Sequence, residues 1–179
     1  MTHRIRILLA IVVIVGALMR LYDLPRGDAI SDEVLYGFRS IGYLDFDFAV
    51  AQPTTLQLVA PDTAEIPLWT KLSFHDHPPL VFVVQHWFLR IAGANLWGLR
   101  LPSALFGIAS LFLVYLITKK LFSDRAGLVA ASLMTAQVLM IYVSRTGIQE
   151  SQVIFFMLLS GYSFLKAQDQ PWWYLGFGA

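Results

Sequence analysis

Apolar runs separated by short polar stretches form the main pattern of this chain, and the first of them covers residues 7–19. Taken from 5 to 24, the segment is long enough to cross a bilayer if Arg20 extends its side chain toward the head groups. A secretory signal peptide is the alternative, but no small-residue cleavage site follows the run. We therefore predict an uncleaved anchor with its basic end in the cytoplasm.

Three further apolar runs predict transmembrane helices over 101–118, 126–143 and 152–165. Another apolar segment begins at Trp172 and reaches the last residue, 179. A span that starts in this way indicates the N-terminal part of a longer transmembrane protein.

The stretch 25–100 is different and is predicted to be a long external loop with two helices on the membrane surface. The first, near 32–44, has Ser31 as a suitable N-cap and acids in its first turn. The second, over 80–92, is either a surface helix or another span. Its length is short for a span, and its polar residues fall on one side of a helical wheel. These residues are Gln85, His86 and Arg90.

The distribution of basic residues favours the surface helix. If 80–92 stays outside, Lys119, Lys120, Arg125 and Lys166 all fall on the cytoplasmic side, as the positive-inside rule requires. If it crossed the membrane, the same residues would face outward. The prediction is an all-α polytopic membrane protein with four to five transmembrane helices, and residues 1–179 form part of one transmembrane domain.

Composition agrees with this class, because 57% of residues are hydrophobic and only 14% are charged. The net charge of +1 gives no sign of nucleic-acid binding. The absence of cysteine excludes disulfides, thiolate catalysis and cysteine-based metal sites.

The predicted topology gathers the ionisable candidates on the external face. Asp32 and Glu33 are either a solvated helix start or a general base with its neighbour. His75, Asp76 and His77 are either ligands of a divalent metal ion or a polar turn before a proline-initiated helix. The remaining candidates are Arg100, Arg145 and Glu150. They are either structural, as interface anchors or as an Arg–Glu pair, or functional.

Four motifs follow one another along the chain: Asp32-Glu33 after the first span, His77-Pro78-Pro79-Leu80, Arg100-Leu101-Pro102-Ser103-Ala104-Leu105-Phe106-Gly107 and Tyr142-Val143-Ser144-Arg145. Together they resemble the C-type glycosyltransferase superfamily, which uses polyprenyl-phosphate sugars. The most similar branches are the protein O-mannosyltransferases, the lipid A aminoarabinose transferase and many uncharacterised bacterial members.

The resemblance implies a reaction on the external, periplasmic face of a bacterial plasma membrane. A sugar passes with inversion from a polyprenyl-phosphate donor to a hydroxyl of a lipid, glycan or protein acceptor. It implies that Asp32 is the catalytic base and that Glu33 supports it or binds a metal ion. The leaving phosphate needs positive charge, from a metal ion or from basic side chains, and the candidates for binding it are His77, Arg100 and Arg145. Glu150 matches an acid in a later external loop.

The sequence departs from the aminoarabinose branch at two positions. That branch has a lysine at the position of His77 and an arginine at that of Leu35, so aminoarabinose is not the expected sugar. Two alternatives stay open: a non-catalytic membrane protein, such as a transporter module or assembly subunit, and an inactive fragment of the transferase.

Overall fold

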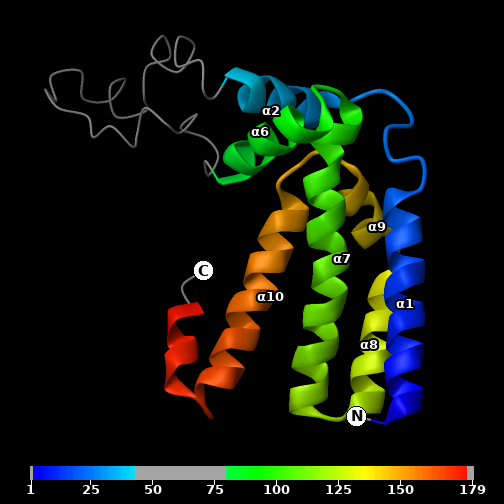
Figure 1. Ribbon diagram of the computed structural model, residues 1–179, viewed down its shortest axis with the longest axis vertical. Helices are drawn as coiled ribbons and strands as arrows, with labels where there is room; N and C mark the ends of the chain where they lie inside the picture. The colour runs from blue at the N-terminus through cyan, green and yellow to red at the C-terminus, as the bar shows by residue number, and fades with distance from the viewer. Residues whose placement is uncertain (1, 43–79, 177–179) are drawn as a thin grey trace, which may run out of the picture. The chain divides into compact units, whose positions relative to one another are not determined.

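A computed structural model describes residues 2–42 and 80–176, and all regular secondary structure in these residues is helical (Figure 1). The chain divides into two compact units, one made of Met1–Arg26 with Arg100–Ala179 and the other of Gly27–Leu99. The helices are α1 (His3–Leu21), α2 (Ser31–Gly42), α6 (Leu80–Ala92), α7 (Leu96–Leu121), α8 (Asp124–Ala136), α9 (Val138–Arg145), α10 (Glu150–Ala167) and the short 3-10 helix η1 (Pro171–Gly176).

In the first unit, α1 lies along α8, and η1 folds back against α10 (Figure 1). Leu9 of α1, Tyr115 of α7 and Ala131 of α8 form a buried apolar cluster where three helices meet. Small residues allow the helices to approach closely. A Cβ built on Gly16 would lie 2.4 Å from Leu111, and one on Gly107 would lie 2.1 Å from the Ser144 hydroxyl. Such small-residue contacts are typical of helices that associate within a membrane.

The polar and apolar positions of this unit are arranged oppositely to those of a water-soluble bundle. Hydroxyl side chains are buried, among them Ser103, Ser110, Ser144 and Ser151. Many large apolar side chains of α1, α8 and α10 are exposed instead, including Ile14, Leu18, Leu133 and Met157. A lipid environment favours this distribution, because apolar surface costs nothing there and polar groups find partners inside the bundle.

One helix of the described residues, α7, is by itself long and apolar enough to cross a membrane. It extends beyond the predicted 101–118 at both ends and holds Pro102 in its interior. The Asn95 side chain caps its start by accepting a hydrogen bond from the Gly98 amide at 3.0 Å.

The predicted continuous helix over 126–143 is wrong in one respect. The chain forms two helices, α8 and α9, that meet at Gln137 with a bend of 63°. Taken together, the two helices are long and apolar enough for one broken span or for a re-entrant loop. The break leaves carbonyl groups at the end of α8 without intrahelical partners, and one of them finds a partner in α1.

That partner is Arg20, and the expectation that its side chain extends toward the head groups is wrong. Arg20 is 0% exposed. Its Nη2 donates to the Met134 carbonyl at 3.5 Å, its Nη1 to the Gly16 carbonyl at 3.1 Å and its Nε to the Ser144 hydroxyl at 3.3 Å. A charged side chain turns inward here because helix ends and a hydroxyl supply the polar partners that lipid cannot.

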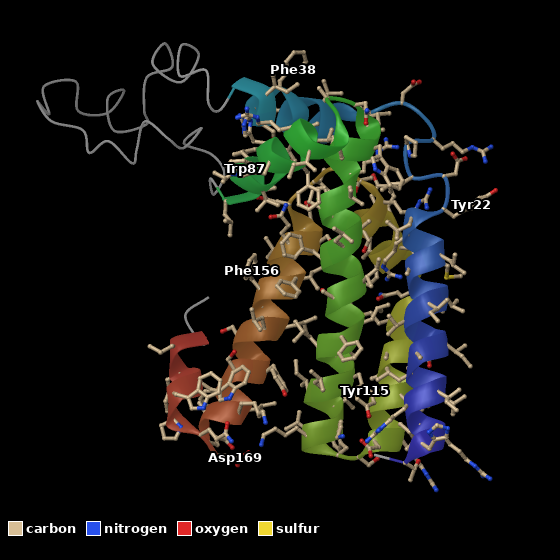
Figure 2. The ribbon with its side chains drawn as sticks, in the orientation of Figure 1. Tyr22, Phe38, Trp87, Tyr115, Phe156 and Asp169 are labelled. Atoms are coloured by element: carbon tan, nitrogen blue, oxygen red, sulfur yellow. The ribbon has the colours of Figure 1, made fainter. Side chains whose placement is uncertain are left out.

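The second unit pairs α2 with α6 and also places polar side chains inside. The Ser40 hydroxyl lies 2.7 Å from the Gln85 amide oxygen, and His86 Nδ1 lies 2.9 Å from the Ser40 carbonyl. Phe38 and Trp87 are exposed (Figure 2). The sequence predicted that the polar side of α6 faces water. In the structure, Gln85 and His86 on that side face α2 instead, whereas Arg90 is exposed.

Candidate functional site

The adjacent acids Asp32 and Glu33 lie in the first turn of α2. This helix begins at Ser31, whereas the prediction of Ser31 as N-cap placed the first helical residue at 32. The Glu33 and Val34 amides both donate to the Ile30 carbonyl, at 2.7 and 3.2 Å. The two carboxylates face different surroundings, because Asp32 is exposed whereas Glu33 is 0% exposed. A helix start favours negative charge at both positions through its unpaired amides. Of the two carboxylates, Asp32 is therefore the one at the surface of the described residues.

The packing of α2 on α6 keeps the buried acid in place. Tyr36 meets Phe82 edge-on with ring centroids 5.6 Å apart, and the Arg39 guanidinium lies over the same Phe82 ring at 5.8 Å. Gly37 faces Leu99, where an added Cβ would be 3.3 Å away. With the Ser40–Gln85 hydrogen bond, these contacts fix the face of α2 that carries Glu33 and leave the face with Asp32 open.

Arg100 is buried in α7, and its Nη1 donates to the carbonyls of Leu24 and Arg26 at 3.0 and 2.9 Å. The guanidinium therefore binds the chain that leaves α1 toward Gly27. The prediction that Arg100 binds a phosphate is not tested by these contacts, but part of its hydrogen-bonding capacity is in use within the chain.

Arg145, the last residue of α9, binds the end of α1. Its Nη1 donates to the Met19 and Tyr22 carbonyls at 3.0 and 2.8 Å, and its Nη2 donates to the Asp23 carbonyl at 3.0 Å. A cation at this position complements the partial negative charge of a helix C-terminus. Asp23 has a positive φ of 48°, so the guanidinium also stabilises the turn that ends α1.

Glu150 is exposed in the first turn of α10, and within the described part of the chain it makes no ion pair with Arg145. The Arg–Glu pair considered from the sequence is therefore wrong. Hydroxyl groups attach this region to α7 instead. Ser103 donates to the Ile148 carbonyl at 3.2 Å, and Ser151 donates to the Ser103 carbonyl at 2.6 Å.

The predicted cluster of His75, Asp76 and His77 lies outside the described residues. Within 2–42 and 80–176, no group of three His, Cys, Asp or Glu side chains could hold a metal ion. Sequence reasoning underestimated one residue, Arg20. Two features of the sequence were available as a signal for its buried position. Arg20 is a charged residue near the end of an apolar run, and a serine-containing motif, Tyr-Val-Ser-Arg, follows later in the chain.

Comparison with known proteins decides the family. Residues 76–179, more than half of the chain, match the family described as dolichyl-phosphate-mannose-protein mannosyltransferase. The chain belongs to this mannosyltransferase family. The resemblance to C-type glycosyltransferases that the motifs indicated is confirmed.

Two curated relatives of this chain come from Bacillus subtilis (strain 168). The chain is 27% identical to "Putative mannosyltransferase YycA" over 171 aligned residues. This alignment covers 94% of this chain and 23% of that protein. It is 33% identical to "Putative mannosyltransferase YkcB" over 92 aligned residues, and this alignment covers 51% of this chain and 13% of that protein. The chain thus spans less than a quarter of the length of either relative. No solved structure matches it.

Proposed function

We propose that this chain is part of a polytopic membrane glycosyltransferase that takes a sugar from a polyprenyl-phosphate donor. Mannose is the sugar that the family and the names of both relatives suggest. The acceptor is a hydroxyl of a lipid, glycan or protein on the external face of a bacterial plasma membrane. The N-terminus and the lysine-rich helix ends then lie in the cytoplasm.

The observation that carries the mechanism is the contrast between the two acids of α2. Asp32 is exposed, and Glu33 beside it is buried. In an inverting transfer the acceptor oxygen attacks the anomeric carbon opposite the leaving group. The bond from that carbon to the phosphate oxygen breaks, and the acceptor proton passes to the base. We assign the base to Asp32 and a supporting, positioning role to Glu33.

Positive charge for the leaving polyprenyl phosphate is proposed to come from His77, Arg100 and Arg145. Arg145 is the best supported of the described candidates. The structure records three of its five N–H groups in hydrogen bonds to carbonyls, which leaves Nε and one N–H of Nη2 for an anion. Glu150 is exposed at the start of α10 and is kept as an acceptor-side candidate.

A divalent metal ion bound by Glu33, His75, Asp76 and His77 also remains a proposal. The described residues alone do not fit such a site, because they hold no group of three suitable ligands. We therefore assign no step of the transfer to a metal ion. Loss of activity on chelation, with rescue by a divalent ion, would support the site.

The test is sugar transfer by the complete protein in membrane vesicles, with radiolabelled polyprenyl-phosphate mannose as donor. Asp32→Asn should lower turnover by about 10²- to 10⁴-fold, because the acceptor loses its base. Asp23→Asn is the matched control: its carboxylate makes only an exposed contact with Arg26, and asparagine tolerates a positive φ. Near-normal turnover of Asp32→Asn, with both variants inserted in the membrane, would refute the assignment.

A second candidate function, a transporter module, is favoured by one observation. Arg20 is a buried cation beside the broken pair α8–α9, and ionisable groups at helix breaks mark substrate paths in transporters. This alternative expects solute uptake by proteoliposomes and no turnover of polyprenyl-phosphate sugars. It also expects that Arg20→Gln abolishes uptake.

A further inference from the structure

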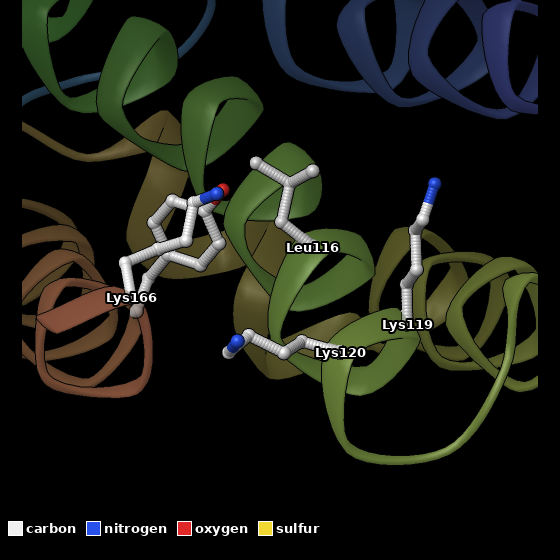
Figure 3. Close-up of a pocket in the computed structure, with 5 residues that line it drawn as sticks. Leu116, Lys119, Lys120 and Lys166 are labelled. Carbon is white, nitrogen blue, oxygen red and sulfur yellow. The ribbon is translucent and has the colours of Figure 1, made fainter. Parts of the chain in front are cut away.

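The first unit contains a lysine-lined pocket that the proposed transfer reaction does not use. It lies where α7 and α10 end and has a volume of about 370 Å³. Its lining residues are Leu116, Lys119, Lys120, Tyr162 and Lys166 (Figure 3). Three ammonium groups around one small pocket make it a candidate for an anionic ligand.

The three lysines are not equally available. Lys119 is paired with Asp124 at 2.9 Å, and its side chain points away from Lys120 and Lys166 in the close-up (Figure 3). Lys120 is paired with Asp169 at 2.5 Å, but the Asp169 side chain is 62% exposed. Lys166 has no ion pair within the part of the chain that is described. A ligand therefore finds one available ammonium group and a second one held only by a surface pair, which is weak and exchangeable.

The other lining residues suit a phosphate that is attached to an apolar body. The Tyr162 hydroxyl can donate a hydrogen bond, and its ring is held edge-on against Trp173 of η1 with centroids 5.8 Å apart. Leu116 supplies an apolar wall beside the ammonium groups. The ends of α7 and α10 also carry partial negative charge from their carbonyls, which offsets some of the lysine charge. Lys166 should therefore decide whether an anion binds.

Aromatic residues next to the pocket indicate its depth in a membrane. Trp172 and Tyr174 of η1 are 62% and 55% exposed, and η1 packs on α10, which supplies Tyr162 and Lys166. Exposed tryptophan and tyrosine are typical of the head-group region. Basic pockets between transmembrane helices at this depth bind anionic head groups.

We propose that this pocket binds the phosphate of an anionic membrane lipid, with Lys166 as the primary cation and Lys120 as the second after it separates from Asp169. The same phosphate chemistry could also come from solution. The proposal does not depend on the transfer reaction, and it places a ligand at the opposite end of α7 from Arg100.

The experiment uses the full chain in nanodiscs of phosphatidylcholine with a minor fraction of phosphatidylglycerol, and native mass spectrometry measures the retained lipid. The wild type should retain phosphatidylglycerol in preference to phosphatidylcholine. Lys166→Gln should lower that retention about fivefold, the effect expected of one lysine at an anionic surface. Asp169→Asn should raise it, because Lys120 becomes available.

Arg125→Gln is the matched control, since Arg125 is an exposed cation in the first turn of α8 and does not line the pocket. Lys166→Arg should keep retention within about twofold and shows that charge matters, not a folding defect. Displacement of the lipid by millimolar inorganic phosphate would assign the ligand to solution, and resistance to it would assign the ligand to the lipid. Equal losses in Lys166→Gln and Arg125→Gln, or no preference for phosphatidylglycerol, would overturn the proposal.

Discussion

Arg100 of α7 and Arg145 of α9 donate to backbone carbonyls of the same short segment, the end of α1 and the turn after it. Arg145 binds Met19, Tyr22 and Asp23, whereas Arg100 binds Leu24 and Arg26. Two motif arginines that are 45 residues apart in sequence therefore determine where the chain leaves α1. We interpret this pair as the interaction that holds the turn after α1 within the first unit.

Arg145→Ala should destabilise the first unit by about 1–3 kcal/mol, because three carbonyls at a helix end lose a charged donor. Thermal unfolding of the full chain in detergent measures the effect. Arg125→Ala, which removes an exposed arginine, should change stability by less than about 0.5 kcal/mol. Equal melting temperatures of the two variants would contradict the role of Arg145.

Gly107→Ala should destabilise the bundle by about 1–3 kcal/mol through overpacking. Its Cβ would lie 2.1 Å from the Ser144 hydroxyl, which also lies 3.3 Å from Arg20. Gly161→Ala in α10 is the control, because its added Cβ would meet no atom within 4 Å apart from its chain neighbours and its own helix backbone. It should stabilise by about 0.5–1 kcal/mol, since alanine is the better helix former. Thermal unfolding distinguishes the two, and a neutral Gly107→Ala would show that α7 and α9 separate easily.

Ser40→Ala should cost about 1–2 kcal/mol, because it removes a buried hydroxyl that lies 2.7 Å from both the Tyr36 carbonyl and the Gln85 amide oxygen. Ser132→Ala removes a hydroxyl whose one partner among the described residues is the Leu128 carbonyl on its own helix, so it should be close to neutral. Hydrogen exchange of α2 and α6 amides reports the difference. Unchanged protection in Ser40→Ala would mean that apolar packing alone holds α2 on α6.

Glu33→Gln and Asp32→Asn should separate stability from activity. Both variants lose a negative charge at the helix start, but Glu33 is 0% exposed and Asp32 is exposed, so the Glu33 variant should lower the melting temperature more. Asp32→Asn should fold normally and fail in transfer. If Asp32→Asn unfolds at lower temperature than Glu33→Gln, the two acids have exchanged roles.

The contact of Asp169 with Lys120 should persist to low pH. The Lys120 hydrogen bond holds the pKa of the Asp169 carboxyl below its ordinary value of 3.8. The contact is therefore present above pH 3.8 and is lost as pH falls through the lowered value. Carboxyl-selective NMR titration of the full chain should show this midpoint, and Lys120→Gln should return it toward 3.8. An identical midpoint in both proteins would show that the pair does not form.

Most helices and the family were predictable from the sequence. The helix over 80–92 forms over those residues, and the motif at Arg100 proved to belong to a mannosyltransferase family. Apolar runs and proline positions are local signals, and helix formation responds to them directly. The external placement of the surface helices and the membrane crossings stay predictions.

The direction of each polar side chain could not be read from the sequence. Periodicity placed Gln85 and His86 on one side of α6, but only the position of α2 decided that this side is inside. The same holds for Arg20, whose partners at Met134 and Ser144 exist only because the chain breaks at Gln137. Carbonyls at a helix break form a binding site for a cation only when another helix lies beside them.

Asp32 and Glu33 illustrate what the sequence determines and what the tertiary structure determines. The sequence alone determined that Asp32 and Glu33 stand at a helix start in a chain with the motifs of a sugar transferase. The tertiary structure decided that Glu33 is buried and Asp32 exposed. Adjacent residues of a helix point about 100° apart, so the packing of one face selects which carboxylate remains open to a reactant.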